Sequence, residues 1–238
     1  MNVASHIEEI AGIRSFVAVS ERAGPRAAIL FYSDIFQLTA PHRRLATRLA
    51  ERGCLVIAPE IYRGIEAPGM VLDFDRDRQR ALDDSARVRV EDADADREAL
   101  IAHLASRPGV DASRLFVAGN CFGGHLAFRA AYDRRVAAVA CFYPTTVHAD
   151  RLGASEGVDT LTRAADLHAK LLLVWGARDP HIPTEGRARI EETLRRANAR
   201  FETRTFDAEH AFMRDEGARF DPVATEAALE ATFAFFGI

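Results

Sequence analysis

Short apolar runs alternate along the chain with segments whose apolar residues recur every three or four positions. A run of four to eight apolar residues is typical of a buried strand, whereas the wider spacing is typical of a helix that packs by one face. Strands separated by helices in this way indicate a mainly parallel sheet covered on both faces, and thus an α/β fold. The strands are predicted at residues 27–32, 54–58, 114–118, 136–142, 170–175 and 201–206, with an early antiparallel strand at 13–19.

Helices are predicted between these strands. The first opens at Pro41 and stops at Gly53, because proline is favoured in the first turn of a helix and glycine just after the last. The segment Asp111 to Ser113 is predicted to be a turn. The other helices are predicted at about residues 76–104, 122–132, 184–198 and 222–235. We find no internal repeat and no linker, so residues 1–238 are predicted to form a single domain.

Charge and hydropathy exclude several classes of protein. The 238 residues are 48% hydrophobic and 28% charged, and no apolar run approaches the roughly 20 residues that cross a bilayer. Residues 1–10 carry His6, Glu8 and Glu9 where a signal peptide would have basic and then apolar residues. We therefore expect a cytoplasmic protein without a membrane partner. A net charge of −4 and an isoelectric point of about 6.1 disfavour a nucleic-acid partner, which would favour a basic surface.

Neither a metal nor an organic cofactor is expected. The three cysteines, Cys54, Cys121 and Cys141, are too widely spaced for a disulfide framework or a zinc site. Cys54 and Cys141 fall inside apolar strands and are expected to be core residues. Lys170 is the only lysine, so any anion site in this chain must rely on arginine, whose planar guanidinium matches a carboxylate.

The candidate nucleophile lies in the sequence Gly119-Asn120-Cys121-Phe122-Gly123, between a predicted strand and a predicted helix. A Gly-x-nucleophile-x-Gly elbow occupies this setting, and its turn is too tight for side chains at the two glycines. Cys121 would then lie at a helix N-terminus, which favours a thiolate, and the N–H of Phe122 would be free to stabilise an oxyanion. The alternative is a tight turn that carries a buried structural cysteine.

A thiol nucleophile needs a base and a group that orients the base. In this architecture the chain order is nucleophile, acid, histidine, with the last two on loops after later strands. Asp179 and His210 each follow a predicted strand in that order. Taken alone, Asp179 could be a turn former and His210 a solvated loop residue. His125 is expected to be buried against the sheet, whereas His181 could line the cleft.

Several motifs in order along the chain resemble the dienelactone hydrolase family, whose members are α/β-hydrolases with a cysteine nucleophile. The motifs are Asp34-Ile35-Phe36, Ala58-Pro59-Glu60-Ile61-Tyr62-Arg63, Ala67-Pro68-Gly69, Arg78-Gln79-Arg80, Gly119-Asn120-Cys121-Phe122-Gly123-Gly124, Asp179, and His210-Ala211-Phe212-Met213-Arg214. The resemblance implies Cys121 as nucleophile, His210 as general base and acid, and Asp179 as the carboxylate that orients it. It also implies an oxyanion hole formed by the backbone N–H groups of Ile35 and Phe122.

The resemblance implies three further roles. Asp34 stands where the family carries a glutamate that hydrogen-bonds the resting thiol and helps to deprotonate it; a turn-forming aspartate is the alternative. Arg80 and Arg214 stand where two arginines bind the substrate carboxylate, although Arg80 could also be a solvated helix charge. The chain departs from the family pattern at Gln37, where a glycine is usual, and at Asp84 and Arg87, where aromatic residues are usual.

The expected function is hydrolysis of a small carboxylated enol-lactone, or a related carboxylic ester, through a Cys121 acyl-enzyme. The expected partner is therefore a small anionic substrate, and the protein is expected to be a monomer or a small homo-oligomer. One alternative is a broader carboxylesterase that acts on neutral esters. Another, from a different class, is a non-catalytic binding relative that kept the fold.

Overall fold

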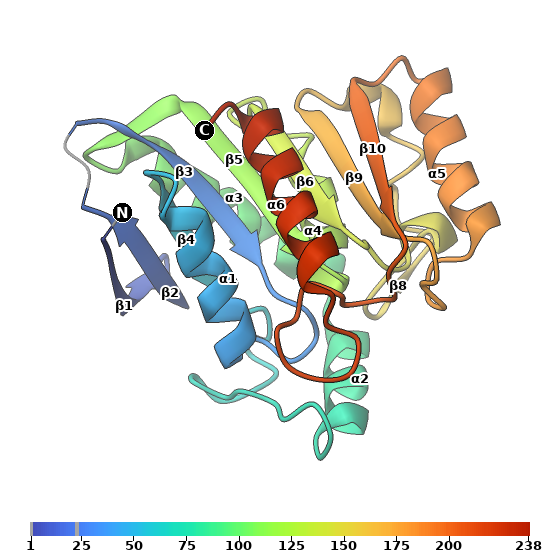
Figure 1. Cartoon of the computed structure of the whole chain (residues 1–238), viewed down its shortest axis with the longest axis horizontal. Helices are drawn as coiled ribbons and strands as arrows, with labels where there is room; N and C mark the ends of the chain where they lie inside the picture. Colours follow the sequence, from blue (N-terminus) through green and yellow to red (C-terminus); the bar gives the residue numbers. More distant parts are fainter. Residues whose placement is uncertain (1, 22–23) are drawn as a thin grey trace.

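The computed structural model describes residues 2–21 and 24–238, and its centre is a sheet of eight strands in the order β1-β2-β4-β3-β5-β6-β9-β10 (Figure 1). From β4 onward in this order all strands are parallel, whereas β1 and β2 pair antiparallel with each other and β2 pairs antiparallel with β4. The strands are β1 (Val3–Ile10), β2 (Ile13–Ser20), β3 (Arg26–Tyr32), β4 (Leu55–Pro59), β5 (Val110–Asn120), β6 (Ala138–Phe142), β9 (Lys170–Gly176) and β10 (Phe201–Phe206). The predicted α/β class, with a mainly parallel sheet, is confirmed.

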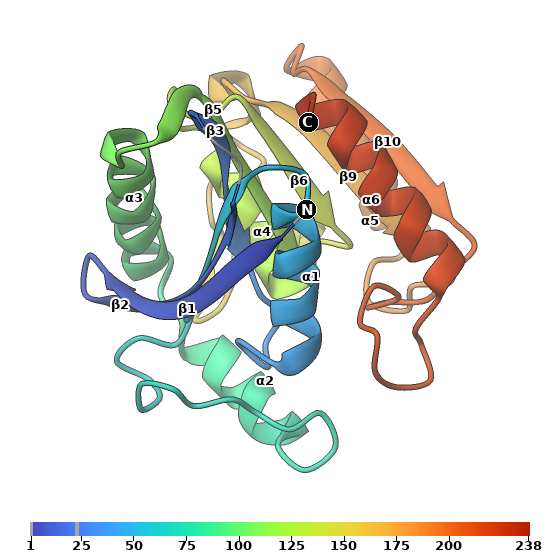
Figure 2. The same ribbon diagram turned by 60° about the vertical axis from the view of Figure 1, so that its left-hand side comes forward.

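Helices cover both faces of the sheet. The helices are α1 (Ala40–Ala50), α2 (Arg78–Arg87), α3 (Val90–Ser106), α4 (Phe122–Ala130), α5 (Thr184–Arg196) and α6 (Pro222–Phe236). Figures 1 and 2 show α1 and α6 on one face and α3 and α4 on the other. The helix α2 lies beyond the carboxyl ends of the central strands, where the loops that follow these strands gather.

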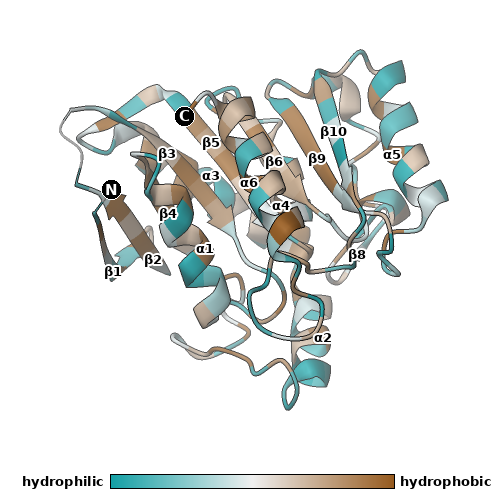
Figure 3. Cartoon of the chain, viewed as in Figure 1, coloured by the Kyte–Doolittle hydropathy of each residue, from teal (hydrophilic) through white to brown (hydrophobic). Residues whose placement is uncertain are grey.

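The core is built from the strands that the apolar runs predicted. Every residue of β4 and β6 is buried, and β3, β5, β6 and β9 are mostly hydrophobic along their length (Figure 3). Parallel strands between two helical layers have no solvated face, which explains the continuous runs in place of alternation. Cys54 and Cys141 are buried in this core as expected. No helix in residues 2–21 and 24–238 is long and apolar enough to cross a membrane.

The helical region predicted at about residues 76–104 is present, but it consists of two helices, α2 and α3, that are separated at Val88 and Arg89. Both residues have extended backbone, and Val88 is buried. The carbonyl oxygen of Val88 accepts a hydrogen bond of 2.8 Å from the N–H of Ala154. A segment more than sixty residues away in sequence thus stabilises the break between the two helices. The local sequence pattern therefore does not predict this break.

Three further strands were not predicted. The edge strand β1 is largely exposed and lacks an apolar run, and it forms by pairing with the buried strand β2. The strands β7 (Arg151–Leu152) and β8 (Ser155–Glu156) form a hairpin too short to leave a periodic signal. The turn predicted at residues 111–113 is wrong, since β5 already includes these residues; Asp111 nevertheless accepts the N–H of Ser113, as it would in a turn.

Candidate active site

Cys121 stands alone between the last residue of β5 and the first residue of α4, with φ of 56° and ψ of −119°. A non-glycine residue at positive φ is strained and persists only where its surroundings impose it. The elbow is imposed by close backbone packing: a Cβ on Gly119 would lie 2.1 Å from the Gly123 oxygen, and one on Gly123 would lie 2.2 Å from the Ser33 oxygen. Both glycines of the motif are therefore required, and the predicted strand–nucleophile–helix turn is present.

His210 and Asp179 lie together at the carboxyl ends of neighbouring strands. His210 follows β10 and Asp179 follows β9, and their Nδ1 and Oδ2 atoms are 2.7 Å apart in a buried contact. The other carboxylate oxygen of Asp179 accepts the backbone N–H of His181 at 2.8 Å, which fixes its orientation. The rings of Tyr143 and His181 meet the His210 ring edge-on, with centroids 5.0 and 4.7 Å away.

The surroundings of His210 favour its charged form. Burial by itself disfavours the imidazolium, but the charge of the Cys121 sulfur and hydrogen bonds to Asp179 and Cys121 outweigh burial. Together they raise the pKa of His210 from 6.5 to about 10. Burial and the charge of His210 lower the pKa of the adjacent His181. The arrangement suits a His210 ring that can take up and hold a proton while Asp179 orients it.

Two backbone N–H groups are available beside the sulfur. Phe122 is the first residue of α4, where an N–H has no acceptor within the helix, and Ile35 lies in the turn after β3. In the part of the chain that the structure describes, neither group donates to a protein acceptor. Both residues line the same pocket as Cys121. Two N–H groups without a protein acceptor therefore lie on the pocket that Cys121 lines, as the predicted oxyanion hole would need.

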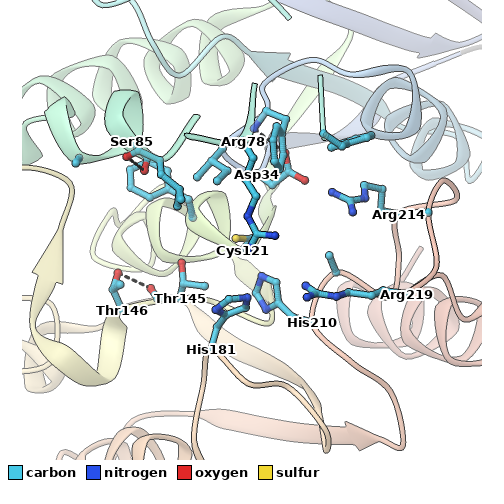
Figure 4. A pocket seen from close by; sticks show the side chains of 18 of the residues that line it. Asp34, Arg78, Ser85, Cys121, Thr145, Thr146, His181, His210, Arg214 and Arg219 are labelled. Atoms are coloured by element: carbon cyan, nitrogen blue, oxygen red, sulfur yellow. Dashed lines mark hydrogen bonds between the residues drawn. The ribbon is translucent and has the colours of Figure 1, made fainter. Parts of the chain in front are cut away.

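Asp34 lines the pocket close to these groups (Figure 4). Its Oδ1 accepts the N–H of Phe36 at 2.9 Å, a contact that shapes its own turn. Burial raises the pKa of Asp34 above its ordinary value of 3.8, although this hydrogen bond and the charges of Arg214 and His210 oppose the shift. Asp34 is therefore both a turn former and a carboxyl group within the electrostatic reach of the site.

The pocket has a volume of about 700 Å³ and lies against the carboxyl ends of the strands. Figure 4 shows Arg78 extending from α2 in the direction of Cys121, while Arg214 and Arg219 point inward from the loop between β10 and α6. The Arg214 guanidinium lies 3.9 Å from the centroid of the Phe74 ring, a cation–π contact that holds it at the pocket wall. His181 also lines the pocket, as the sequence allowed.

The structure does not bring Arg80 to the pocket, and this prediction needs correction. Arg80 instead donates two hydrogen bonds, of 2.7 and 2.6 Å, to Glu66 in the preceding loop. Arg78, which begins the same helix two residues earlier, lines the pocket in its place. The family motif includes both arginines, and only the direction of the helix decides between them. Asp84 and Arg87 also lie outside the pocket lining, and burial together with the neighbouring carboxyl of Glu66 raises the pKa of Asp84.

The structure explains how Gln37 replaces the glycine that is usual in the family. It has φ of 66°, the left-handed region in which glycine is favoured. Its buried side chain accepts the N–H of Ile61 at 3.1 Å and donates to the oxygen of Met70 at 3.0 Å. These two hydrogen bonds hold the loop after β4, and they offset the strain of a non-glycine residue at positive φ.

His125 has a structural role, and several residues that line the pocket were not predicted from sequence. His125 is buried and contacts the hydroxyls of Thr146 and Thr160, as expected of a residue against the sheet. The pocket also includes Thr145, Arg151 and Arg219, which sequence reasoning did not identify because they lie in loops or, for Arg151, in the two-residue strand β7. Within residues 2–21 and 24–238, no group of three or more His, Cys, Asp or Glu side chains could hold a metal ion.

Comparisons with known proteins agree with this geometry. The model of the dienelactone hydrolase family matches residues 13–238. A Saccharomyces cerevisiae protein named "putative carboxymethylenebutenolidase" is 34% identical over 94% of this chain and 86% of its own length. The carboxymethylenebutenolidase of Rhodococcus opacus is 32% identical over 83% and 75%. The crystal structure of a "putative dienelactone hydrolase" from Klebsiella pneumoniae superposes with a TM-score of 0.85 at 27% identity, covering 100% of this chain and 99% of that one. The chain therefore belongs to the dienelactone hydrolase family and is a carboxylic ester hydrolase.

Proposed function

We propose that this enzyme hydrolyses a small carboxylated enol-lactone, or a related carboxylated ester, through a Cys121 acyl-enzyme. The observation that carries the proposal is the strained elbow at Cys121, which opens onto the same pocket as His210, the partner of buried Asp179. A non-catalytic relative would have no need to keep a strained nucleophile beside an oriented base.

In the acylation step the Cys121 sulfur attacks the ester carbonyl and a carbon–sulfur bond forms. The negative charge that develops on the carbonyl oxygen is accepted by the N–H groups of Phe122 and Ile35. One such donor is typically worth about 3–4 kcal/mol of barrier. The bond to the ring or leaving-group oxygen then breaks, and the imidazolium of His210 gives this oxygen its proton.

Deacylation uses the same histidine in the opposite sense. Once the sulfur is acylated it carries no charge, so two of the influences that raise the pKa of His210 disappear. Burial then favours the neutral imidazole, which accepts a proton from water as the oxygen attacks the thioester. The carbon–sulfur bond breaks and the carboxylic acid product is released. The free Cys121 sulfur and the protonated His210 are thereby regenerated.

The substrate carboxylate is assigned to Arg78 and Arg214. Both arginines line the pocket, and neither forms an ion pair within the described residues. Because the whole chain has a net charge of −4, an anionic substrate requires local cations of this kind.

Arg214→Ala and Arg78→Ala are each expected to lower kcat/KM for a dienelactone by roughly tenfold or more, mainly through KM. Hydrolysis of a neutral aryl ester should change little, because that ester lacks the group that the arginines hold. Arg80→Ala is the matched control: it removes an arginine from the same helix that is paired with Glu66 outside the pocket lining. Equal losses for anionic and neutral esters would refute the carboxylate site and favour the broader carboxylesterase.

Asp34→Asn is expected to slow acylation by roughly tenfold, because the negative charge of Asp34 near His210 favours transfer of the thiol proton to the imidazole. The asparagine oxygen can still accept the N–H of Phe36, so the turn should survive and only the charge is lost. Since the pKa of Asp34 is raised, wild type should approach the variant as the pH falls through that raised pKa. The measurement is the pre-steady-state acylation rate against pH. An unchanged acylation rate would show that Asp34 only shapes its turn and has no role in the reaction.

A further inference from the structure

One side of the pocket takes no part in the chemistry proposed above. We call it the hairpin side; it is lined by Ser85, Ala86, Thr145, Thr146, Arg151 and Gly153. In Figure 4 the labelled members Ser85 and Thr146 lie on the far side of Cys121 from Arg214 and Arg219. The backbone N–H of Arg151 reaches the oxygen of Thr146 at 3.5 Å, which places Arg151 at this end.

The hairpin side is held in place by close packing. Gly153, in the turn between β7 and β8, has φ of 56°, and a Cβ there would lie 2.0 Å from the oxygen of Val88. The N–H of Ala154 donates to the same oxygen at 2.8 Å, and the hydroxyl of Ser155 accepts the N–H of Val90 at 3.4 Å. The hairpin that carries Arg151 is thus docked on the connection between α2 and α3.

Arg151 has no anionic partner in the described part of the chain, although two acids lie beside it. Glu156 stands directly opposite Arg151 in the hairpin, yet the two side chains form no ion pair. Asp150, its neighbour in sequence, is engaged by Arg189. Many other arginines of this protein are paired, as Arg80 is with Glu66 and Arg44 with Asp215. Arg151 is exposed, lines the pocket and has no protein carboxylate as partner in the described residues, so its guanidinium is free to bind an external anion.

The size of the pocket supports a substrate that extends beyond a single small ring. Cavities of about 300–1,000 Å³ accommodate drug-sized ligands, and this one has about 700 Å³. In Figure 4 Arg214 and Arg219 lie on one side of Cys121, and Ser85 and Thr146, which line the hairpin side together with Arg151, lie on the other. The hydroxyl of Thr145 forms no side-chain hydrogen bond within the described residues, so it adds a polar group on the hairpin side.

We propose that Arg151 binds a second carboxylate, so that the preferred substrates are dianionic esters or lactones with one carboxylate on each side of the scissile carbonyl. This inference rests on the proposed function, which assigns the first carboxylate to Arg78 and Arg214. The two ends of the pocket then act together to orient the carbonyl carbon over the Cys121 sulfur.

The test uses four aryl esters of matched length. They are 4-carboxyphenyl hemiadipate with two carboxylates, phenyl hemiadipate and 4-carboxyphenyl hexanoate with one each, and phenyl hexanoate with none. In wild type, kcat/KM for the dianion should exceed that for either monoanion by about tenfold or more. Arg151→Gln should bring close to one the preference over the monoanion that lacks the carboxylate bound by Arg151. It should keep the preference over the other monoanion and leave phenyl hexanoate within about twofold of wild type. Arg134→Gln is the matched control, because Arg134 is exposed and lies outside the pocket lining.

The outcomes separate this inference from the proposed function. Equal effects of Arg151→Gln on all four esters, or no effect on the dianion, would overturn the second carboxylate site. Wild-type indifference between the monoanions and phenyl hexanoate would refute the first carboxylate site, whatever Arg151 does. Thermal unfolding of the Arg151→Gln variant should match wild type, and a loss specific to the dianion cannot arise from misfolding.

Discussion

Cys121→Ala should abolish ester hydrolysis, with a loss of roughly 10⁴-fold or more in kcat, and leave the fold intact. The loss is large because the thiol forms the covalent intermediate, and the remaining oxyanion donors and binding contacts supply only a small part of the rate. Stability should be nearly unchanged, because alanine and cysteine both place a Cβ on the strained backbone at φ of 56°. The measurements are steady-state hydrolysis and thermal unfolding of the same preparation.

Cys141→Ala is the matched control for this experiment. It removes a buried thiol from β6, in register with Gly119, so it should lower stability and keep the activity. Rapid quenching with a slow substrate should also give wild-type protein an added acyl mass, which Cys121→Ala should lack. Retained hydrolysis in Cys121→Ala would end the acyl-enzyme mechanism.

Asp179→Asn should reduce kcat/KM by roughly 10³-fold, the second-largest effect expected. Asparagine can present an amide N–H where the carboxylate accepts Nδ1–H of His210, so the imidazole loses its orientation and a hydrogen bond that favours its charged form. Asp207→Asn is the control, because Asp207 is an exposed acid on the loop that carries His210 and pairs with Arg178, the neighbour of Asp179. Comparable losses in both variants would show that the loop, and not the contact with His210, is responsible.

The same variant has a definite pH signature. The folded-state pKa of His210, about 10, lies above its ordinary value of 6.5. The stability that the protonated ring contributes is therefore complete below about pH 6.5 and is lost as the pH rises through 10. Asp179→Asn removes part of this contribution, so the gap in unfolding free energy between wild type and variant should be widest near pH 6 and narrow toward pH 10. Chemical denaturation across this range measures the gap.

Much of the fold could be predicted from sequence, because strands buried on both faces leave continuous apolar runs. The predicted bounds at residues 27–32, 170–175 and 201–206 fall within one residue of β3, β9 and β10. The elbow at Cys121 could also be predicted from sequence. Its two glycines are required by contacts with residues of the same turn and with the end of the neighbouring strand. The chain order of nucleophile, acid and histidine then pointed to Asp179 and His210.

The tertiary structure alone decided which cations face the pocket. Arg78 and Arg80 share a helix and a motif, and the pairing of Arg80 with Glu66 depends on a loop whose course the sequence does not encode locally. The division of α2 from α3 likewise depends on Val88 meeting Ala154. Local backbone geometry and burial depend on residues close in sequence, so the sequence predicts them. The direction of an exposed charged side chain depends on a partner brought near by folding, and it becomes visible only in three dimensions.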